Sequence, residues 1–458
     1  MGSEESYSTR PIHLLDLPNE ILAHIFVYVR GPPYINEPIW LGTLGYWDGG
    51  PKEIKNTRLV CRKFCNESSH LLMPAVSISA NPSSLARLEG ISRHPLIAKG
   101  VRTVRVIVHF YAQKLADEFA VFFPYQQQQL EYGTSQMKDL AEDPEFPWCG
   151  DAELESVAKS NRILDSWEKL AQNIPDSSLD YQDQENIRVI RRAYELYRQA
   201  HLEQERILTD GSFVREVANA VARMPVARDL FVADRDRSAA MKPASFVQRI
   251  EEPDLLIDSL VQPMSWSHAQ ENAIDTEPAE LLSEIPVAIF KAGVMLKNID
   301  YEIAPVKNFF RLFNSLCTFE NLRAATQQLD SFGFHPSITR DLSVEDEEED
   351  MKLLPMFVEA FMDTDSLRDI YINLGFLYQP EEVPEVSAGD LLLTRSWPRL
   401  RLLQFVGPLH FSELEKFYAN VQGQVELGLK EVHLMSGSVS YARGLLLSFK
   451  CCFRRVGS

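Results

Sequence analysis

Near its amino terminus the chain carries apolar residues at helical spacing. Five of them lie three and four positions apart on one face: Ile21, Leu22, Ile25, Phe26 and Val29. Pro18 suits the first turn of a helix, where its missing N–H is not needed, and Glu20 lies near the positive end of the helix dipole. The pattern predicts an amphipathic helix whose apolar face must be covered. We expect that cover to come mostly from another protein.

A second amphipathic pattern spans residues 54–72 and stops before Pro74. Its apolar positions stand among basic and polar residues: Leu59, Val60, Phe64, Leu71 and Leu72. It predicts the next helix. Two or three short helices rarely bury enough surface to be stable alone, so this pair must lean on a partner or on the rest of the chain.

Further along the chain, apolar and polar residues alternate over short segments, which is the pattern of β-strands. Five segments predict strands: residues 101–110, 224–234, 365–376, 397–407 and 428–437. Helical patterns lie before or between them at residues 213–224, 353–363 and 411–422. The strand centres Ile370, Leu402 and Val432 recur about thirty residues apart, slightly beyond the leucine-rich-repeat range of roughly 20 to 29. We therefore predict an α/β fold, an irregular leucine-rich-repeat-like solenoid over residues 76–458 with parallel strands on a concave face. A compact α/β domain is the alternative.

Two stretches interrupt this array. Residues from about 151 to 208 hold two long helical patterns, which predict a helical hairpin insert. The polar segments 124–136 and 142–150 before it read as a loop. The acidic run SVEDEEEDM at residues 343–351 is expected to stay solvated, because close-packed like charges repel, and it lacks the ligand spacing of a calcium loop.

Composition narrows the classes of function. The chain has 458 residues, 45% hydrophobic and 24% charged, which is ordinary for a soluble globular protein. Its net charge of -19 argues against an electrostatic nucleic-acid surface. No segment approaches the roughly 20 apolar residues of a membrane span, and the first residues lack a signal-peptide pattern. Gly2 and Ser6 fit a myristoylation pattern, but no basic patch supplies a second anchor. We expect an intracellular protein, cytoplasmic or nuclear or both.

The chain shows no catalytic or cofactor motif. Phosphate-binding loops, dinucleotide fingerprints, metal-binding helices and nucleophile elbows are absent from the sequence. Its six cysteines form neither a disulfide framework nor a zinc set, so reduced thiols are expected: Cys61, Cys65, Cys149, Cys317, Cys451 and Cys452. Three histidines stand in or beside strand-like segments, where packing or exposure is the simpler interpretation: His109, His410 and His433. We expect no cofactor and no metal.

The two amino-terminal segments together resemble the F-box. The first half matches through Leu17, Pro18, Glu20, Ile21, Leu22, Ile25 and Phe26, and the second through Arg58, Leu59, Val60, Cys61, Arg62 and Phe64. The resemblance covers residues 12–75. Residues 31–53 form an inserted loop that is longer than the usual connection, and similar fungal proteins often carry such inserts.

The resemblance implies a docking function. An F-box binds a Skp-type adaptor, which joins a cullin scaffold and a RING subunit in a ubiquitin ligase. The matched positions would then be adaptor-binding: Leu17, Pro18, Ile21, Leu22, Ile25, Phe26, Leu59, Val60 and Phe64. The solenoid would hold an unknown target protein, so this subunit would not be an enzyme. A repeat scaffold whose F-box-like helices only cap the solenoid is the alternative. A third possibility, an unrecognised enzyme, requires a pocket with convergent polar groups.

Overall fold

The architecture comes from a computed structural model of the whole chain. It describes residues 13–30, 52–143, 150–235, 245–272, 274, 278–304, 309–312, 319–336, 353–374, 389–393, 395–420 and 426–436, the last range by its backbone alone. Several segments discussed above lie outside the described residues: 31–51, 144–149, 343–351, and the positions of Gly2, Ser6, Cys149, Cys317, Cys451 and Cys452.

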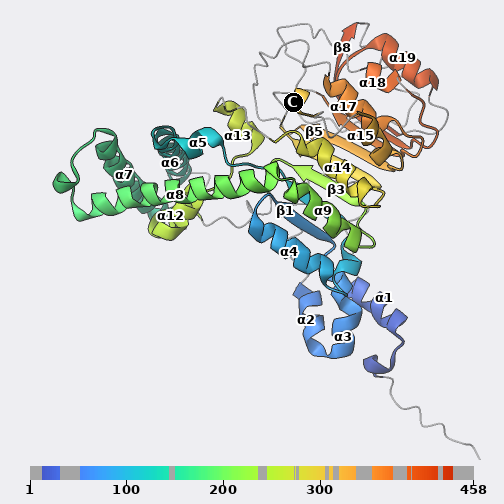
Figure 1. Cartoon of the computed structure of the whole chain (residues 1–458), viewed down its shortest axis with the longest axis horizontal. Helices are drawn as coiled ribbons and strands as arrows, with labels where there is room; N and C mark the ends of the chain where they lie inside the picture. The colour runs from blue at the N-terminus through green and yellow to red at the C-terminus, as the bar shows by residue number, and fades with distance from the viewer. Residues whose placement is uncertain are drawn as a thin grey trace, which may run out of the picture.

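The fold is α/β and is built on one parallel sheet of eight strands that follow each other in chain order (Figure 1). The strands are β1 Ala75–Ser79, β2 Thr103–Ile107, β3 Asp229–Ala233, β4 Asn298–Ile303, β5 Ser331–Pro336, β6 Asp369–Asn373, β7 Leu402–His410 and β8 Glu426–Ser436. Each strand therefore pairs only with its neighbours in the sequence. The five predicted strands are confirmed as β2, β3, β6, β7 and β8, whereas β1, β4 and β5 were not predicted.

Helices between the strands cover one face of the sheet (Figure 1). They are α4 Pro82–Arg93, α9 Ser212–Arg223, α14 Leu281–Lys291, α15 Phe319–Thr326, α17 Leu353–Met362, α18 Asp390–Leu393 and α19 Phe411–Asn420, with the short 3-10 helices η6 Ala98–Gly100 and η8 Phe309–Leu312. The helices predicted at 213–224, 353–363 and 411–422 are confirmed as α9, α17 and α19.

Two rows of side chains cross the sheet in register and form the core beneath these helices. One row is Val76, Val104, Leu230, Ile299, Phe332, Ile370 and Leu403, and the other is Ile78, Val106, Val232, Tyr301, Phe334, Ile372 and Phe405. All are buried. Tyr301 reaches into the helical layer, where its hydroxyl donates to the carbonyl of Leu282 in α14 at 2.6 Å. Along each strand, residues that point into this core alternate with residues that point to the other face of the sheet. A slip of one residue in the pairing would move the apolar side chains of that strand out of the core, so this alternation sets the register.

A backbone contact repeats at the start of successive strands. The carbonyl of the residue before one strand accepts two N–H groups from the start of the next. The acceptors are Pro74, Arg102, Arg228, Lys297, Asp330 and Arg368. For example, the carbonyl of Arg228 accepts from the N–H groups of Lys297 and Asn298. Connections of very different length thus enter the sheet in the same way.

Three helices precede the sheet. They are α1 Asn19–Arg30, α2 Lys52–Val60 and α3 Arg62–Ser68, with short 3-10 turns at η1 Leu14–Asp16 and η5 Ser69–Leu71. The prediction of a single helix over 54–72 is wrong, because Cys61 adopts an extended conformation and caps α3, with its sulfur accepting from the N–H of Phe64 at 3.5 Å. The end of the predicted inserted loop, residues 52 and 53, already belongs to α2.

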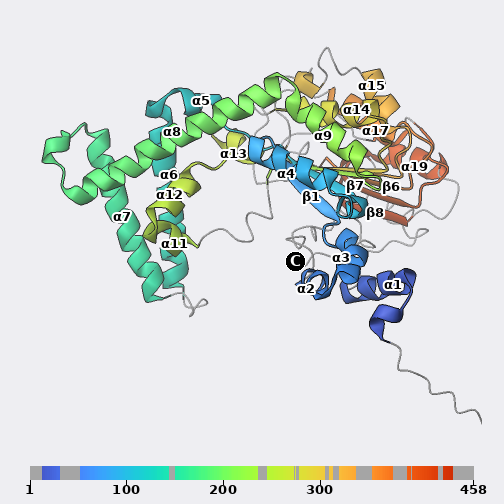
Figure 2. The ribbon, with the colours of Figure 1, turned by 60° about the horizontal axis from the view of Figure 1, so that its bottom comes forward.

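Between β2 and β3 the chain forms a helical arm that projects from the sheet (Figure 2). It comprises α5 Gln113–Asp117, α6 Phe119–Glu142, α7 Asp151–Ala171, the turn η7 Asp176–Ser178 and α8 Tyr181–Thr209. The hairpin predicted over 151–208 is confirmed as α7 and α8. The loop predicted over 124–136 is wrong, because these residues lie within α6. Besides Phe123, its buried positions recur every fourth residue: Phe122, Gln126, Leu130 and Thr134.

A second excursion, between β3 and α14, contains α11 Phe246–Glu251, α12 Pro253–Leu260 and α13 Trp266–Glu271. Trp266 returns to the sheet, where its indole N–H donates to the carbonyl of Val108 at 2.8 Å. Among the described residues no helix has the length and apolar character needed to cross a membrane.

Candidate docking surface

The three amino-terminal helices, which we call the three-helix unit (residues 13–30 and 52–72), have a small core of their own. Leu22, Phe26, Ile54 and Leu71 are buried in it. Four half-buried apolar residues pack around this cluster: Leu17, Ile25, Phe64 and Leu72. The rings of Phe26 and Phe64 meet edge to face with centroids 5.0 Å apart. These side chains hold α1, α2 and α3 together, and Leu22 and Phe26 are already covered by their own chain.

Other apolar side chains of the three-helix unit face water. Leu59 is 84% exposed, Val60 66% and Ile21 46%, and Pro18 is exposed as well. Large apolar groups are also exposed at Leu14, Leu15, Val27, Tyr28 and Val29. The structure thus divides the nine residues of the sequence prediction. Pro18, Ile21, Leu59 and Val60 are available to a partner, Leu17, Ile25 and Phe64 are partly available, and Leu22 and Phe26 are internal.

Polar contacts fix the ends of these helices. The ammonium group of Lys63 on α3 donates to the carbonyls of Leu15 and Leu17 at 2.9 Å each, which ties η1 to α3. The guanidinium of Arg58 donates through Nε to the hydroxyl of Ser69 at 3.0 Å. Because Leu59 follows Arg58 directly, this contact helps to fix the end of α2 from which Leu59 and Val60 project.

Cys61 and Cys65 serve the local backbone. Both thiols are half-buried, Cys61 caps α3, and the sulfur of Cys65 lies 3.7 Å from the hydroxyl of Ser69. Over the part of the chain that the structure describes, no group of three or more His, Cys, Asp or Glu side chains is placed to hold a metal ion.

The face of the sheet opposite the helices carries a different row of side chains. In register across the strands stand Ser77, Arg105, Phe231, Asp300, Gly333, Tyr371 and Gln404. The guanidinium of Arg105 lies 5.2 Å from the centroid of the Phe231 ring. Arg105, Phe231 and Asp300 are buried, and Tyr371 and Gln404 are half-buried, so this row is largely closed to solvent in the folded chain.

Asp300 is the central acid of this row. Oδ1 of Asp300 lies 3.5 Å from Nε2 of His335, and the ring centroids of His335 and Tyr371 are 3.9 Å apart. A Cβ at residue 333 would collide with the Asp300 carboxylate, so Gly333 leaves the space that the acid uses. Burial, with the nearby charge of Glu302, raises the pKa of Asp300 to about 8. The acid is therefore mainly protonated and neutral at pH 7.

The histidines singled out in the sequence make ordinary contacts. The carbonyl of His109 accepts from the amide of Gln204 at 3.2 Å, and the N–H of His410 donates to the carboxylate of Glu413 at 2.6 Å. His433 lies in β8, where only the backbone is described. Asp300 and His335 were not predicted from the sequence, although acids at alternate positions in NIDYEI, residues 298–303, are a signal for a polar strand face.

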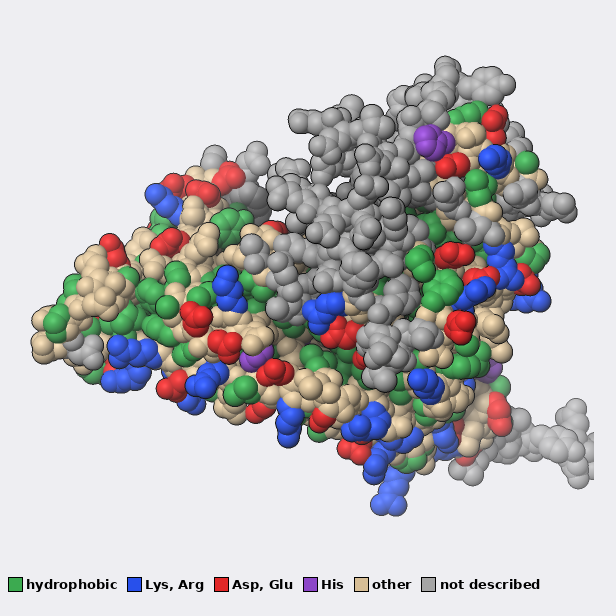
Figure 3. All heavy atoms as spheres, turned by 45° about the horizontal axis from the view of Figure 1, so that its top comes forward, with side chains coloured by type: hydrophobic (Ala, Val, Ile, Leu, Met, Phe, Trp, Pro, Cys, Tyr) green, Lys and Arg blue, Asp and Glu red, His purple; other side chains and the backbone are tan. Residues whose placement is uncertain are grey.

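Comparison with protein-family models, with curated proteins and with solved structures finds no match to this chain. The case for a function therefore rests on the fold and on these surfaces. On the face shown in Figure 3, acidic and basic side chains are interspersed over the described surface.

Proposed function

We propose that this chain is a substrate-recognition subunit of a Skp/cullin/F-box ubiquitin ligase. The three-helix unit would be the F-box that docks on a Skp-type adaptor, and the α/β body would hold the target protein. The observation that carries the proposal is the exposure of Leu59 and Val60 on a small helical unit whose own core is already complete.

Adaptor docking gives these side chains a cover. Burying a large apolar side chain stabilises a complex by roughly 1.5 to 3 kcal/mol, so Ile21, Leu59 and Val60 together represent about 5 to 9 kcal/mol of gross gain. Part of this is offset by the loss of rotational and translational freedom on association. A few apolar anchors of this kind typically dominate a protein–protein interface.

The body of the chain suits target binding. Parallel strands in chain order, each entered through the same backbone contact, support the interpretation of an irregular leucine-rich-repeat-like solenoid with the arm as an insert. In such a solenoid the strand face opposite the helices is the usual binding surface. Here Arg105 and Asp300 on that face are buried, and half-buried positions such as Tyr371 and Gln404 are the ones a target could reach.

The subunit would not itself carry out chemistry. Its contribution would be to hold the target near the conjugating enzyme recruited through the cullin and RING subunits, which raises the effective concentration of target lysines. The place of action would then be the cytoplasm or the nucleus.

The test is co-purification of the full chain with a Skp-type adaptor, comparing wild type with Leu59→Asp. Leu202→Asp is the matched control, because Leu202 is also an exposed leucine on a helix, 53% exposed on α8. We expect capture by wild type and by the control, and its loss in Leu59→Asp with unchanged circular dichroism. Equal capture of both variants, or no capture of folded wild type, would contradict the proposal and leave a repeat scaffold capped by its first helices.

A further inference from the structure

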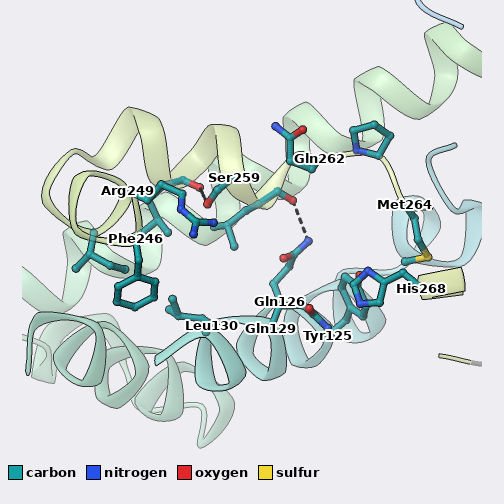
Figure 4. A pocket seen from close by; sticks show the side chains of 15 residues that line it. Tyr125, Gln126, Gln129, Leu130, Phe246, Arg249, Ser259, Gln262, Met264 and His268 are labelled. Carbon is teal, nitrogen blue, oxygen red and sulfur yellow. Dashed lines mark hydrogen bonds between the residues drawn. The ribbon is translucent and has the colours of Figure 1, made fainter. Parts of the chain in front are cut away.

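A pocket of about 220 Å³ lies beside the helical arm (Figure 4). The helices α6, α11, α12 and α13 contribute its walls, which puts it far along the chain from the three-helix unit. Its volume is below the roughly 300–1,000 Å³ of a drug-sized site, so it suits a small molecule and not a folded segment of a partner.

Arg249 supplies the charge of this pocket. Among the described residues no acid pairs with its guanidinium, and the Nε–H group is buried without a hydrogen-bond partner. The guanidinium carbon of Arg249 lies over the ring of Phe246, 6.0 Å from its centroid. Burial lowers the pKa of Arg249, but an arginine remains charged at pH 7. A buried donor without an acceptor is costly, and an anion would satisfy it.

The rest of the lining is mainly neutral. The hydroxyl of Tyr125 lies 3.4 Å from Nδ1 of His268, and burial lowers the pKa of that imidazole, so His268 is uncharged at pH 7. Gln126 is engaged with the backbone, since its amide donates to the carbonyl of Leu260 at 2.8 Å. Gln129 lies three residues further along α6, and its side-chain amide makes no hydrogen bond within the described part of the chain, so it offers a second donor.

An apolar wall faces these donors. Leu130, Phe246 and Ile250 are buried and line the pocket. Gly133 lies in the interior of α6, where glycine costs about 0.5–1 kcal/mol relative to alanine. A Cβ there would make an ordinary contact with Cε2 of Phe246 at 3.5 Å, so a longer side chain at residue 133 would extend into the space beside this ring. Figure 4 shows Arg249 and Phe246 on the α11 side and Leu130 and Gln129 on the α6 side.

We propose that this pocket binds a small organic monoanion, a carboxylate on an apolar or aromatic body, with Arg249 holding the carboxylate and the Phe246 and Leu130 side packing the body. One cation with amide donors matches a single negative charge, whereas phosphate sites usually gather several cations or backbone N–H groups. The proposal goes beyond adaptor docking and stands independently of it.

The test uses para-fluorophenylacetate as the probe, followed by fluorine NMR in the presence of the full chain. Its neutral counterpart is para-fluorophenylacetamide, which has the same shape without the charge. We expect the acid to bind wild type with a dissociation constant of about 1 mM or tighter, and the amide to bind at least about tenfold more weakly.

Three variants distinguish binding of the probe in the pocket from binding elsewhere on the surface. Arg249→Gln removes the cation and is expected to weaken the probe at least about tenfold. Gly133→Leu fills the cavity and is expected to abolish binding. Arg192→Gln is the matched control, an exposed arginine on α8 that pairs with Glu195, and is expected to bind as wild type does.

Binding of the acid that is lost in Arg249→Gln and Gly133→Leu but kept in Arg192→Gln would support the proposal. Equal binding of acid and amide, or equal binding to wild type and Arg249→Gln, would overturn it. Failure of folded wild type to bind this probe, benzoate or hexanoate at millimolar concentration would overturn it as well.

Discussion

The carbonyl oxygen of His70 occupies the position that a Cβ of residue 100 would take. His70 belongs to η5 at the end of the three-helix unit, and Gly100 ends η6 directly before β2. Only glycine allows this approach of the two backbones. The contact therefore fixes how the three-helix unit meets the sheet.

Gly100→Ala is expected to disturb this junction, because the added methyl group must displace backbone rather than a flexible side chain. Overpacking of this kind typically costs about 1–3 kcal/mol. The measurement is the urea midpoint of the full chain. Gly90→Ala is the control, since a Cβ at Gly90 in α4 meets nothing within 4 Å, and alanine in a helix is expected to stabilise by about 0.5–1 kcal/mol. Equal effects of the two substitutions would show that the contact is not close.

The buried and exposed residues of the three-helix unit should differ sharply in their effect on stability. Phe26→Ala is expected to destabilise the unit by about 3–5 kcal/mol, because Phe26 fills its core against Phe64. Leu59→Ala is expected to change stability by less than about 0.5 kcal/mol, because Leu59 is exposed.

The effect of each variant on the stability of the three-helix unit is measured by hydrogen exchange of the backbone amides of α1 and α3. Faster exchange in Phe26→Ala alone is the expected outcome. A comparable increase in Leu59→Ala would mean that Leu59 packs inside the unit, and would also remove the main support for docking.

Asp300 should make the folded state less stable as pH rises. Below the ordinary aspartate pKa of about 3.9 both states are protonated, and above it the unfolded chain ionises first while the folded protein keeps its proton. The free energy of unfolding therefore falls until the folded pKa of about 8 is passed. Burial raises the pKa of Asp234 to about 6, so this acid adds to the fall in the free energy of unfolding between about pH 4 and pH 6.

Asp300→Asn is expected to flatten the upper part of this profile, between about pH 6 and pH 8. Urea unfolding at several pH values, for wild type and variant, measures the difference. Parallel profiles across this interval would show that Asp300 ionises normally in the folded protein.

Tyr197 should anchor α8 to the start of α5, in the segment by which the chain leaves β2. Its buried hydroxyl accepts from the N–H of Ala112 at 2.8 Å. Tyr197→Phe leaves that N–H without its partner, at an expected cost of about 1–3 kcal/mol. The control is Tyr181→Phe at the start of α8, where the side chain is exposed and no change is expected. The unfolding midpoint and the exchange rate of the Ala112 amide measure the effect. A stable Ala112 amide in Tyr197→Phe would contradict it.

The periodic part of the fold was predictable from sequence. Strands such as β6, with Ile370 and Ile372 facing the core, show clear alternation, and α9 shows a clear helical period. β1 alternates clearly but is only five residues long, whereas the residue types of β4 and β5 conceal the pattern. β4 carries Asp300 and Glu302, and β5 contains Gly333. Their buried alternate residues become visible only when the neighbouring strands set the register.

The helix α6 was missed for a related reason. Gln126 and Thr134 occupy buried positions of its four-residue period, where sequence reasoning expects apolar residues. Gln126 is satisfied by the carbonyl of Leu260, and Thr134 by the carbonyl of Leu130 and the hydroxyl of Ser160 at 2.6 Å each. These acceptors include groups far along the chain. A polar residue with a distant partner cannot be distinguished from a loop residue by local pattern.

The nine positions predicted to bind an adaptor illustrate the same limit. Leu22 and Leu59 look alike in the sequence, and only the packing of three helices shows that one is buried and the other exposed. The pocket at Arg249 was not predictable either, because α6 and α11 are about one hundred residues apart in the chain.

The arm leaves and re-enters the sheet without altering how β2 and β3 pair, since Thr103 to Ile107 stand opposite Asp229 to Ala233 residue by residue. The chain bends into α9 at Gly211, whose φ of 66° suits glycine. The arm is thus modular: its length can change without shifting the register in which β2 and β3 pair.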